Sequence, residues 1–101
     1  DKSADNAAFV NALALIEDAA GDERNFVKKA VNWALRNIGK RNLRLHAAAV
    51  ATAEAILAEA ETRAAADRRD PAARSGRWIA RDALRELRRE STLERIRRRS
   101  P

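Results

Sequence analysis

The 101-residue chain has no cysteine, methionine or tyrosine, and it has one histidine, two prolines and three glycines. Without cysteine there is no disulfide framework and no thiol chemistry, and one histidine cannot form a histidine metal cluster. We therefore expect neither a metal nor a cofactor. The longest uncharged run, residues 6–16, is far shorter than the ~20 apolar residues of a membrane span, and the N-terminal segment is acidic. These features predict a soluble, cytoplasmic protein with no membrane partner.

Alanine, leucine, arginine and glutamate dominate the composition, which favours helices and leaves little that could form strands. We predict an all-α fold of four or five helices. Apolar residues at helical spacing, with glycines near the ends of the segments, set the expected boundaries. The predicted helices span residues 4–20, 22–39, 42–66 and 77–90, and a short fifth helix begins at Ser91.

Several of these boundaries depend on local signals. The acidic pair at residues 22–23 opens the second helix, where negative charge suits the positive end of the helix dipole. An Asp-Pro pair and a Ser-Gly pair are breakers that make residues 67–76 a loop. Ser91 and Glu94 have capping-box spacing. We expect the arginine tail at residues 97–99 to fray.

A short internal repeat bears on the architecture. Residues 34–38 (ALRNI) match residues 83–87 (ALREL) at an offset of 49 residues, a little beyond the ~40–47 residue period of two-helix repeats. The chain is then one helical domain with hairpins at 1–40 and 42–90, and a short helix and basic tail at 91–101. Because roughly three or more hairpins make a stable stack, we expect a part of a longer solenoid or a homo-oligomer that completes the stack.

The net charge of +6 is distributed unevenly along the chain. Residues 1–21 and 47–62 each sum to −3, whereas residues 22–46 sum to +5 and residues 63–101 sum to +7. In a stack of hairpins the second helices line one face, so this alternation predicts one positive and one negative surface. DNA is a natural partner for the positive surface. The alternative is an arginine-rich surface that is merely solvated.

Both tryptophans lie away from the centre of the predicted apolar faces. Trp33 is at the edge of the stripe on its helix, with Lys29 and Arg36 one turn away. Trp78 points to the opposite side from the apolar face of its helix, beside two arginines. Large rings among cations suit a groove that grips a phosphate backbone. Alternatively, each ring packs against a neighbouring hairpin under a guanidinium group.

The same segments carry a family resemblance. Residues 22–36 (DERNFVKKAVNWALR), continuing to 39–42 (GKRN), resemble the penultimate-repeat signature of the DNA alkylation repair (AlkD-like) proteins. Residues 77–87 (RWIARDALREL) are similar to the closing helix of that family. The resemblance covers about residues 22–90. It implies the C-terminal repeats of a curved solenoid of HEAT-like helical hairpins.

The resemblance also implies a function. Family members recognise duplex DNA with purines alkylated at N3 or N7 and hydrolyse the N-glycosidic bond, as DNA glycosylases. Trp33 matches an aromatic position that contacts the sugar-phosphate backbone around the lesion, with Lys29 and Arg36 as phosphate ligands. The predicted DNA-binding residues are Lys28, Lys29, Trp33, Arg36, Lys40, Arg41, Trp78, Arg81 and Arg85.

The family's catalytic carboxylate belongs to a Trp-rich segment of an earlier repeat, which this chain lacks. Asp82 follows Trp78 by four residues, but between two arginines it is more simply an ion-pair partner. No catalytic residue is assigned, and excision by the chain alone is not expected. His46 borders an apolar face and is expected to be structural. A different class of function is a non-catalytic HEAT-like scaffold that binds proteins.

Overall fold

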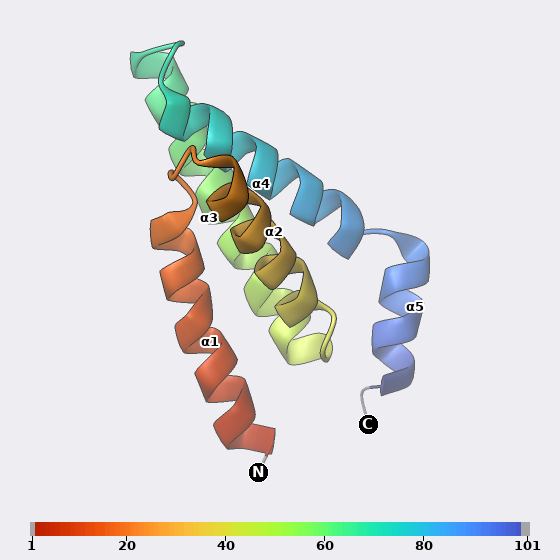
Figure 1. The fold of residues 1–101 in the computed structure, drawn as a ribbon. Coiled ribbons are helices and arrows are strands. Elements are labelled where there is room, and N and C mark those ends of the chain that lie inside the picture. Colours follow the sequence, from red (N-terminus) through yellow and green to blue (C-terminus); the bar gives the residue numbers. More distant parts are fainter. Residues whose placement is uncertain (1, 100–101) are drawn as a thin grey trace.

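The computed structural model describes residues 2–99, with side chains from Asn6 onward, and this range contains five helices and no strand (Figure 1). The predicted all-α fold is confirmed. No helix in this range is both long and apolar enough to cross a bilayer. The helices are α1 (Lys2–Ala19), α2 (Asn25–Gly39), α3 (Leu43–Ala66), α4 (Pro71–Leu87) and α5 (Glu90–Arg99).

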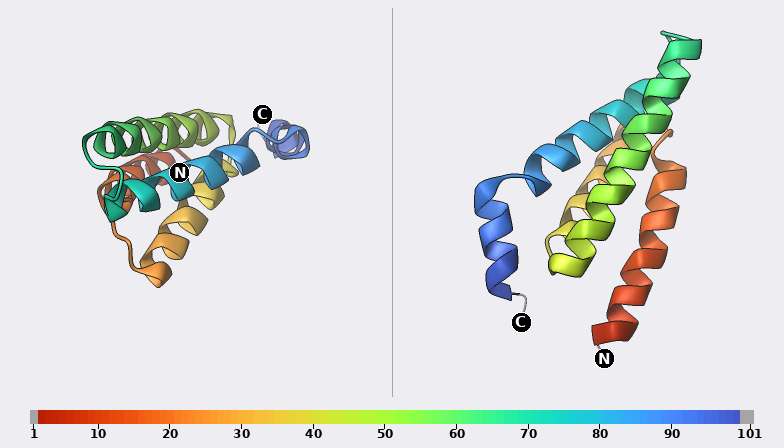
Figure 2. Two further views of the ribbon diagram at one scale, coloured as in Figure 1. Left: turned by 90° about the horizontal axis from the view of Figure 1, so that it is seen from above. Right: turned by 180° about the vertical axis from the view of Figure 1, so that it is seen from behind.

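The first four helices form two layers. Helix α1 lies against α3, and α2 lies against α4, so the odd-numbered helices make one layer and the even-numbered helices the other (Figure 2). The most extensive contact in the molecule is between α3 and α4. This solenoid-like packing agrees with the predicted pair of antiparallel hairpins. Helix α5 leaves the end of α4 as a separate short arm (Figure 1).

Small residues bring α3 close to its neighbours. Ala49 and Ala53 are completely buried. Gly76 of α4 lies so close to α3 that a Cβ atom there would be 3.4 Å from the Cβ of Ala60. Such close packing gains dispersion energy along both helices. The largest fully buried side chains are Leu35, Leu45, Ile79, Leu87 and Ile96.

The predicted loop over residues 67–76 is wrong, because α4 already begins at Pro71. Asp70 caps the helix by accepting a hydrogen bond of 2.9 Å from the backbone N–H of Ala72. Proline suits this first turn, where its missing N–H would have no partner in any case. The predicted Ser-Gly breaker lies inside α4, where the Ser75 hydroxyl donates to the backbone oxygen of Asp22 at 2.9 Å.

Two further boundaries differ from expectation. Helix α2 begins at Asn25, so the acidic pair at 22–23 precedes it, and Asp22 instead pairs with Arg24 at 2.7 Å. The hydrogen bond from the Arg24 side chain lowers the pKa of Asp22. Helix α4 ends at Leu87, and α5 begins at Glu90 and continues to Arg99. The expected fraying at 97–99 is therefore wrong, because Ile96 is buried and holds the last turns of α5 in place.

Candidate nucleic-acid interface

Helix α2 carries two parallel rows of side chains, each with a spacing of four residues. Residues four apart on a helix lie one above the other. The inner ridge, which faces α4, consists of Lys28, Asn32, Arg36 and Lys40. The outer ridge, shifted by one residue, consists of Lys29, Trp33, Asn37 and Arg41, and all four of its side chains are exposed.

The upper half of the inner ridge binds α4 through one stacked cation and one buried amide. The Lys28 ammonium lies 5.1 Å from the centroid of the Trp78 ring, a distance at which cation–π attraction operates. Asn32 is buried, and its Nδ2 donates to the backbone oxygen of Ile79 at 3.2 Å. These contacts join α2 to α4. They also engage the Lys28 ammonium and the Asn32 amide, which are therefore less available to bind a ligand.

The lower half of the inner ridge is neutralised by carboxylates of α4. Lys40 Nζ is 3.0 Å from Glu86 Oε1, and the hydrogen bond from Lys40 is the main cause of a lowered pKa at Glu86. Arg36 has nitrogens 3.9 Å from Asp82 and 4.0 Å from Glu86. The predicted phosphate ligands Arg36 and Lys40 thus already have anionic partners inside the chain.

The predicted arginines of α4 also have partners. Arg81 lies 3.8 Å from Glu61 of α3, and Arg85 lies 3.7 Å from Asp82. Asp82 therefore forms surface ion pairs, as expected, although its partners are Arg36 and Arg85. Both α4 arginines are exposed, so these contacts are weak ones that solvent screens.

The outer ridge is different, because its groups are not paired with carboxylates. Trp33 is 65% exposed, as its helical position predicted. Lys29 and Arg41 form no ion pair with any residue that the structure describes. The Arg41 guanidinium lies 4.2 Å from the centroid of the Phe9 ring, and Asn37 Nδ2 donates to the backbone oxygen of Trp33 at 2.8 Å.

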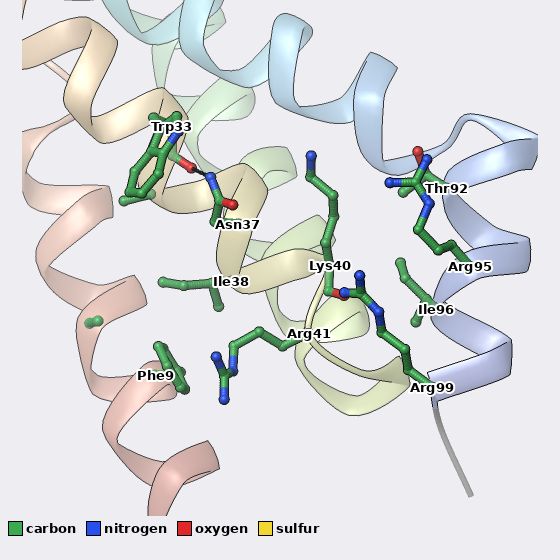
Figure 3. Close-up of a pocket in the computed structure, with 12 residues that line it drawn as sticks. Phe9, Trp33, Asn37, Ile38, Lys40, Arg41, Thr92, Arg95, Ile96 and Arg99 are labelled. Atoms are coloured by element: carbon green, nitrogen blue, oxygen red, sulfur yellow. Dashed lines mark hydrogen bonds between the residues drawn. The ribbon is translucent and has the colours of Figure 1, made fainter.

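The outer ridge forms one wall of a groove of about 590 Å³, the α2–α5 groove (Figure 3). Helix α5 supplies the opposite wall, and Phe9 of α1 lies at one end. Arg99 Nη1 donates to the backbone oxygen of Lys40 at 3.1 Å, which ties α5 to the end of α2. No carboxylate lines the groove within the described residues. Its aromatic and cationic lining consists of Phe9, Trp33, Lys40, Arg41, Arg95 and Arg99.

Over residues 2–87 the sequence matches the family described as DNA alkylation repair enzyme. The chain belongs to this family. No curated protein and no solved structure matches the chain. The matched segment covers α1 to α4, and α5 lies beyond it.

In this DNA alkylation repair protein, the structure divides the predicted DNA-binding residues among three places. Trp33, Lys40 and Arg41 meet in the α2–α5 groove, and Lys29 continues the outer ridge above them. The Lys28–Trp78 stack lies apart from that groove. The remaining three residues are engaged in ion pairs: Arg36, Arg81 and Arg85.

Three aromatic or cationic residues of the groove were not predicted from the sequence: Phe9, Arg95 and Arg99. The expected fraying of residues 97–99 excluded Arg99 from the predicted site, and Arg95 was expected only as part of a short fifth helix. The spacing of Thr92 and Ile96, one helical turn apart, was the available signal, since both are buried in α5.

His46 of this family member has a structural position. The His46 ring lies with Nε2 2.8 Å from the backbone oxygen of Leu87, linking α3 to α4. In the part of the chain that the structure describes, no group of three His, Asp or Glu side chains is placed to hold a metal ion.

Proposed function

We propose that this chain is the DNA-binding portion of a DNA alkylation repair protein, which holds the backbone of duplex DNA containing purines alkylated at N3 or N7. The observation that carries the proposal is the outer ridge with its groove, where the exposed indole of Trp33 shares a surface with cations that have no carboxylate partner among the described residues: Lys29, Arg41, Arg95 and Arg99. A large exposed ring is costly in water unless a ligand covers it. Phosphates would neutralise the adjacent cations.

The internal ion pairs decide which cations contribute most. A cation that is already paired must lose its carboxylate contact before it gains a phosphate, so the net gain is small. Lys29 and Arg41 lose no such contact. We therefore assign the principal backbone contacts of α2 to the outer ridge, with smaller contributions from Arg36 and Lys40.

We do not expect base excision by this chain alone. Cleavage of the glycosidic bond creates positive charge on the sugar, which a carboxylate facing the sugar could stabilise. Asp82 and Glu86 are turned toward cations of α2 instead, and no carboxylate lines the groove in the described residues.

Binding of a short duplex, followed by fluorescence anisotropy over ~50–200 mM salt, tests the proposal. The Lys29→Gln/Arg41→Gln variant is expected to bind more weakly and to lower the steepness of the log–log salt dependence by about 1.8, at ~0.9 per phosphate contact. Arg68→Gln/Arg69→Gln, at the exposed turn between α3 and α4, removes the same charge elsewhere. Equal losses in the two variants, or no binding of wild type at low salt, would contradict the proposal.

A protein-binding scaffold is the second candidate, and a specific surface favours it. A groove of about 570 Å³ between α1, α3 and the start of α4 is lined mostly by small residues, with Ile56, three carboxylates (Glu17, Asp18 and Glu59) and one cation (Arg63). Such a surface suits a basic helical segment of a partner protein. Absence of salt-dependent DNA binding, with affinity for a basic helical peptide that Glu17→Gln/Glu59→Gln removes, would favour the scaffold.

A further inference from the structure

Helix α5 builds the second wall of the groove although it lies beyond the family match. Thr92 and Ile96 are buried on its inner side. The bond from Arg99 to the Lys40 backbone oxygen fixes its far end. This docking places Arg95 and Arg99 across the groove from the outer ridge (Figure 3). The groove is thus formed between two separate helices, α2 and α5, and both are fixed in place by contacts with the rest of the chain.

The dimensions of the groove restrict what can enter it. A volume of about 590 Å³ is within the ~300–1,000 Å³ of small-molecule sites. It admits one or two nucleotide units and excludes the cross-section of a duplex. A duplex held by the outer ridge would therefore lie over the rim of the groove, and only a strand that has left its partner could reach the groove floor.

The chemistry of the lining matches an unpaired strand. Proteins that hold single strands combine cations along the backbone with rings on which bases stack. Arg41, Arg95 and Arg99 form no ion pair with a residue that the structure describes. Arg41 covers the Phe9 ring, which leaves Trp33 as the stacking surface of the groove.

We propose that the α2–α5 groove holds an unpaired stretch of a DNA strand, with its phosphates against Arg41, Arg95 and Arg99 and one base stacked on Trp33. The inference rests on the proposed DNA-binding function and makes it specific. The outer ridge above the groove holds the duplex, and the groove takes up the strand where pairing is lost.

Trp33 fluorescence provides a direct test. In a Trp78→Phe background, Trp33 is the only indole of the chain. Titration with an eight-nucleotide oligothymidylate is expected to quench its emission, because a stacked base quenches indole. An abasic deoxyribose phosphate oligomer of the same charge is expected to bind without comparable quenching. Equal quenching by the two oligomers, or none by either, would overturn the inference.

A matched pair of α5 variants tests the cationic wall. Arg95→Gln/Arg99→Gln removes two groove cations, whereas Arg97→Gln/Arg98→Gln removes two exposed cations that do not line the groove. The first variant is expected to weaken oligothymidylate binding at least ~10-fold at low salt and to reduce the salt slope by about 1.4, at ~0.7 per contact for single strands. Equal losses in both variants would overturn the inference. Arg95→Gln alone keeps the Arg99 bond to α2 and is expected to show half of the change in slope.

Parallel titrations with a fully paired duplex separate this inference from the proposed function. Duplex binding without oligothymidylate binding in the groove overturns the inference and leaves the proposed function standing. Oligothymidylate binding without duplex binding supports the inference and overturns the duplex proposal. Failure to bind either DNA overturns both.

Discussion

Glu86 is a central ionic residue of the interface between the even-numbered helices. It lies 3.0 Å from Lys40, 4.0 Å from Arg36 and 3.1 Å from Arg89. The Lys40 hydrogen bond lowers its pKa below the ordinary value of 4.5. A lowered pKa means that the folded state favours the charged carboxylate.

This arrangement gives a pH-dependent stability. The contribution of Glu86 is fully present above the ordinary pKa and is lost as the pH falls through the lowered value of the folded state. We expect Glu86→Gln to reduce the free energy of unfolding by about 1–2 kcal/mol at neutral pH, and by much less near pH ~2. Urea denaturation at both pH values measures this. Glu94→Gln on the exposed side of α5 is the control, and a pH-independent loss in Glu86→Gln would contradict the assignment.

Gly39 is required by close packing at the end of α2. A Cβ atom at this position would lie 2.6 Å from Leu87 Cδ2 and 3.0 Å from the Cβ of Ala49. We expect Gly39→Ala to cost about 1–3 kcal/mol by overpacking, although alanine is the better helix former. Chemical denaturation should show little change for Gly21→Ala, whose Cβ would make an ordinary 3.4 Å contact with Ala72. Equal stability of the two variants would contradict this explanation.

At the residue scale, helical spacing predicted the exposure of both tryptophans but not which cations are free. The partner of Lys40 is Glu86, 46 residues away, and only the packing of α2 on α4 brings them together. The offset between Lys28 and Lys29 is one residue, yet it separates a cation stacked on Trp78 from an exposed one. Such a distinction requires the tertiary structure.

Helix α5 is held by few contacts, and Ile96 is its main anchor at 1% exposure. We expect Ile96→Ala to weaken the docking of α5 onto the rest of the chain by about 2–4 kcal/mol. An isolated ten-residue helix is marginally stable at best, so α5 should then unfold locally. Hydrogen exchange should then accelerate over residues 90–99 while α3 stays protected. Arg97→Ala, on the exposed side of α5, is the control. Unchanged protection of α5 in Ile96→Ala would contradict its role as the anchor.

At the element scale, the number and order of helices followed from composition and periodicity. The errors lie where a breaker residue has a tertiary use. Pro71 starts α4 and Gly76 allows α4 to approach α3, so neither interrupts the helix. The tail at 97–99 is helical because Ile96 is buried against the rest of the molecule, a contact that local sequence does not report.

At the scale of the whole molecule, part of the positive charge of the even-numbered layer is paired with carboxylates of the odd-numbered layer. Arg77 of α4 lies 3.1 Å from Glu61, and Arg88, just after α4, lies 3.2 Å from Glu54, so carboxylates of α3 pair with cations at both positions. The predicted positive surface is therefore narrower than a sum over the even-numbered helices suggests. The outer ridge of α2 and helix α5 carry exposed cations with no carboxylate partner among the described residues, as does the turn between α3 and α4 at Arg68 and Arg69.

A further prediction at this scale concerns base excision by the chain alone. We expect the isolated chain to release no base from a duplex containing 7-methylguanine, because the two carboxylates of α4 that face α2, Asp82 and Glu86, are held in ion pairs. Mass spectrometry of the released base measures this. Release that depends on Asp82, lost in Asp82→Asn but not in Glu94→Gln, would show that the chain is catalytic by itself.

The outer side of α1 bears on assembly. Val10 and Leu15 of this helix are 46% and 71% exposed. A preceding hairpin of a longer solenoid or a second copy of the chain would cover them. The longer stack or homo-oligomer stays a prediction of the sequence.

The two ridges of α2 have a consequence for how the protein can change. Substitutions on the inner ridge act on contacts that hold α2 to α4, whereas substitutions on the outer ridge alter no ion pair among the described residues. A saturation scan across α2 should therefore give two interleaved four-residue patterns, one in folding and one in affinity. Folding and affinity therefore depend on neighbouring positions of the same helix. Substitutions on the outer ridge can change the affinity for a ligand while the fold stays intact.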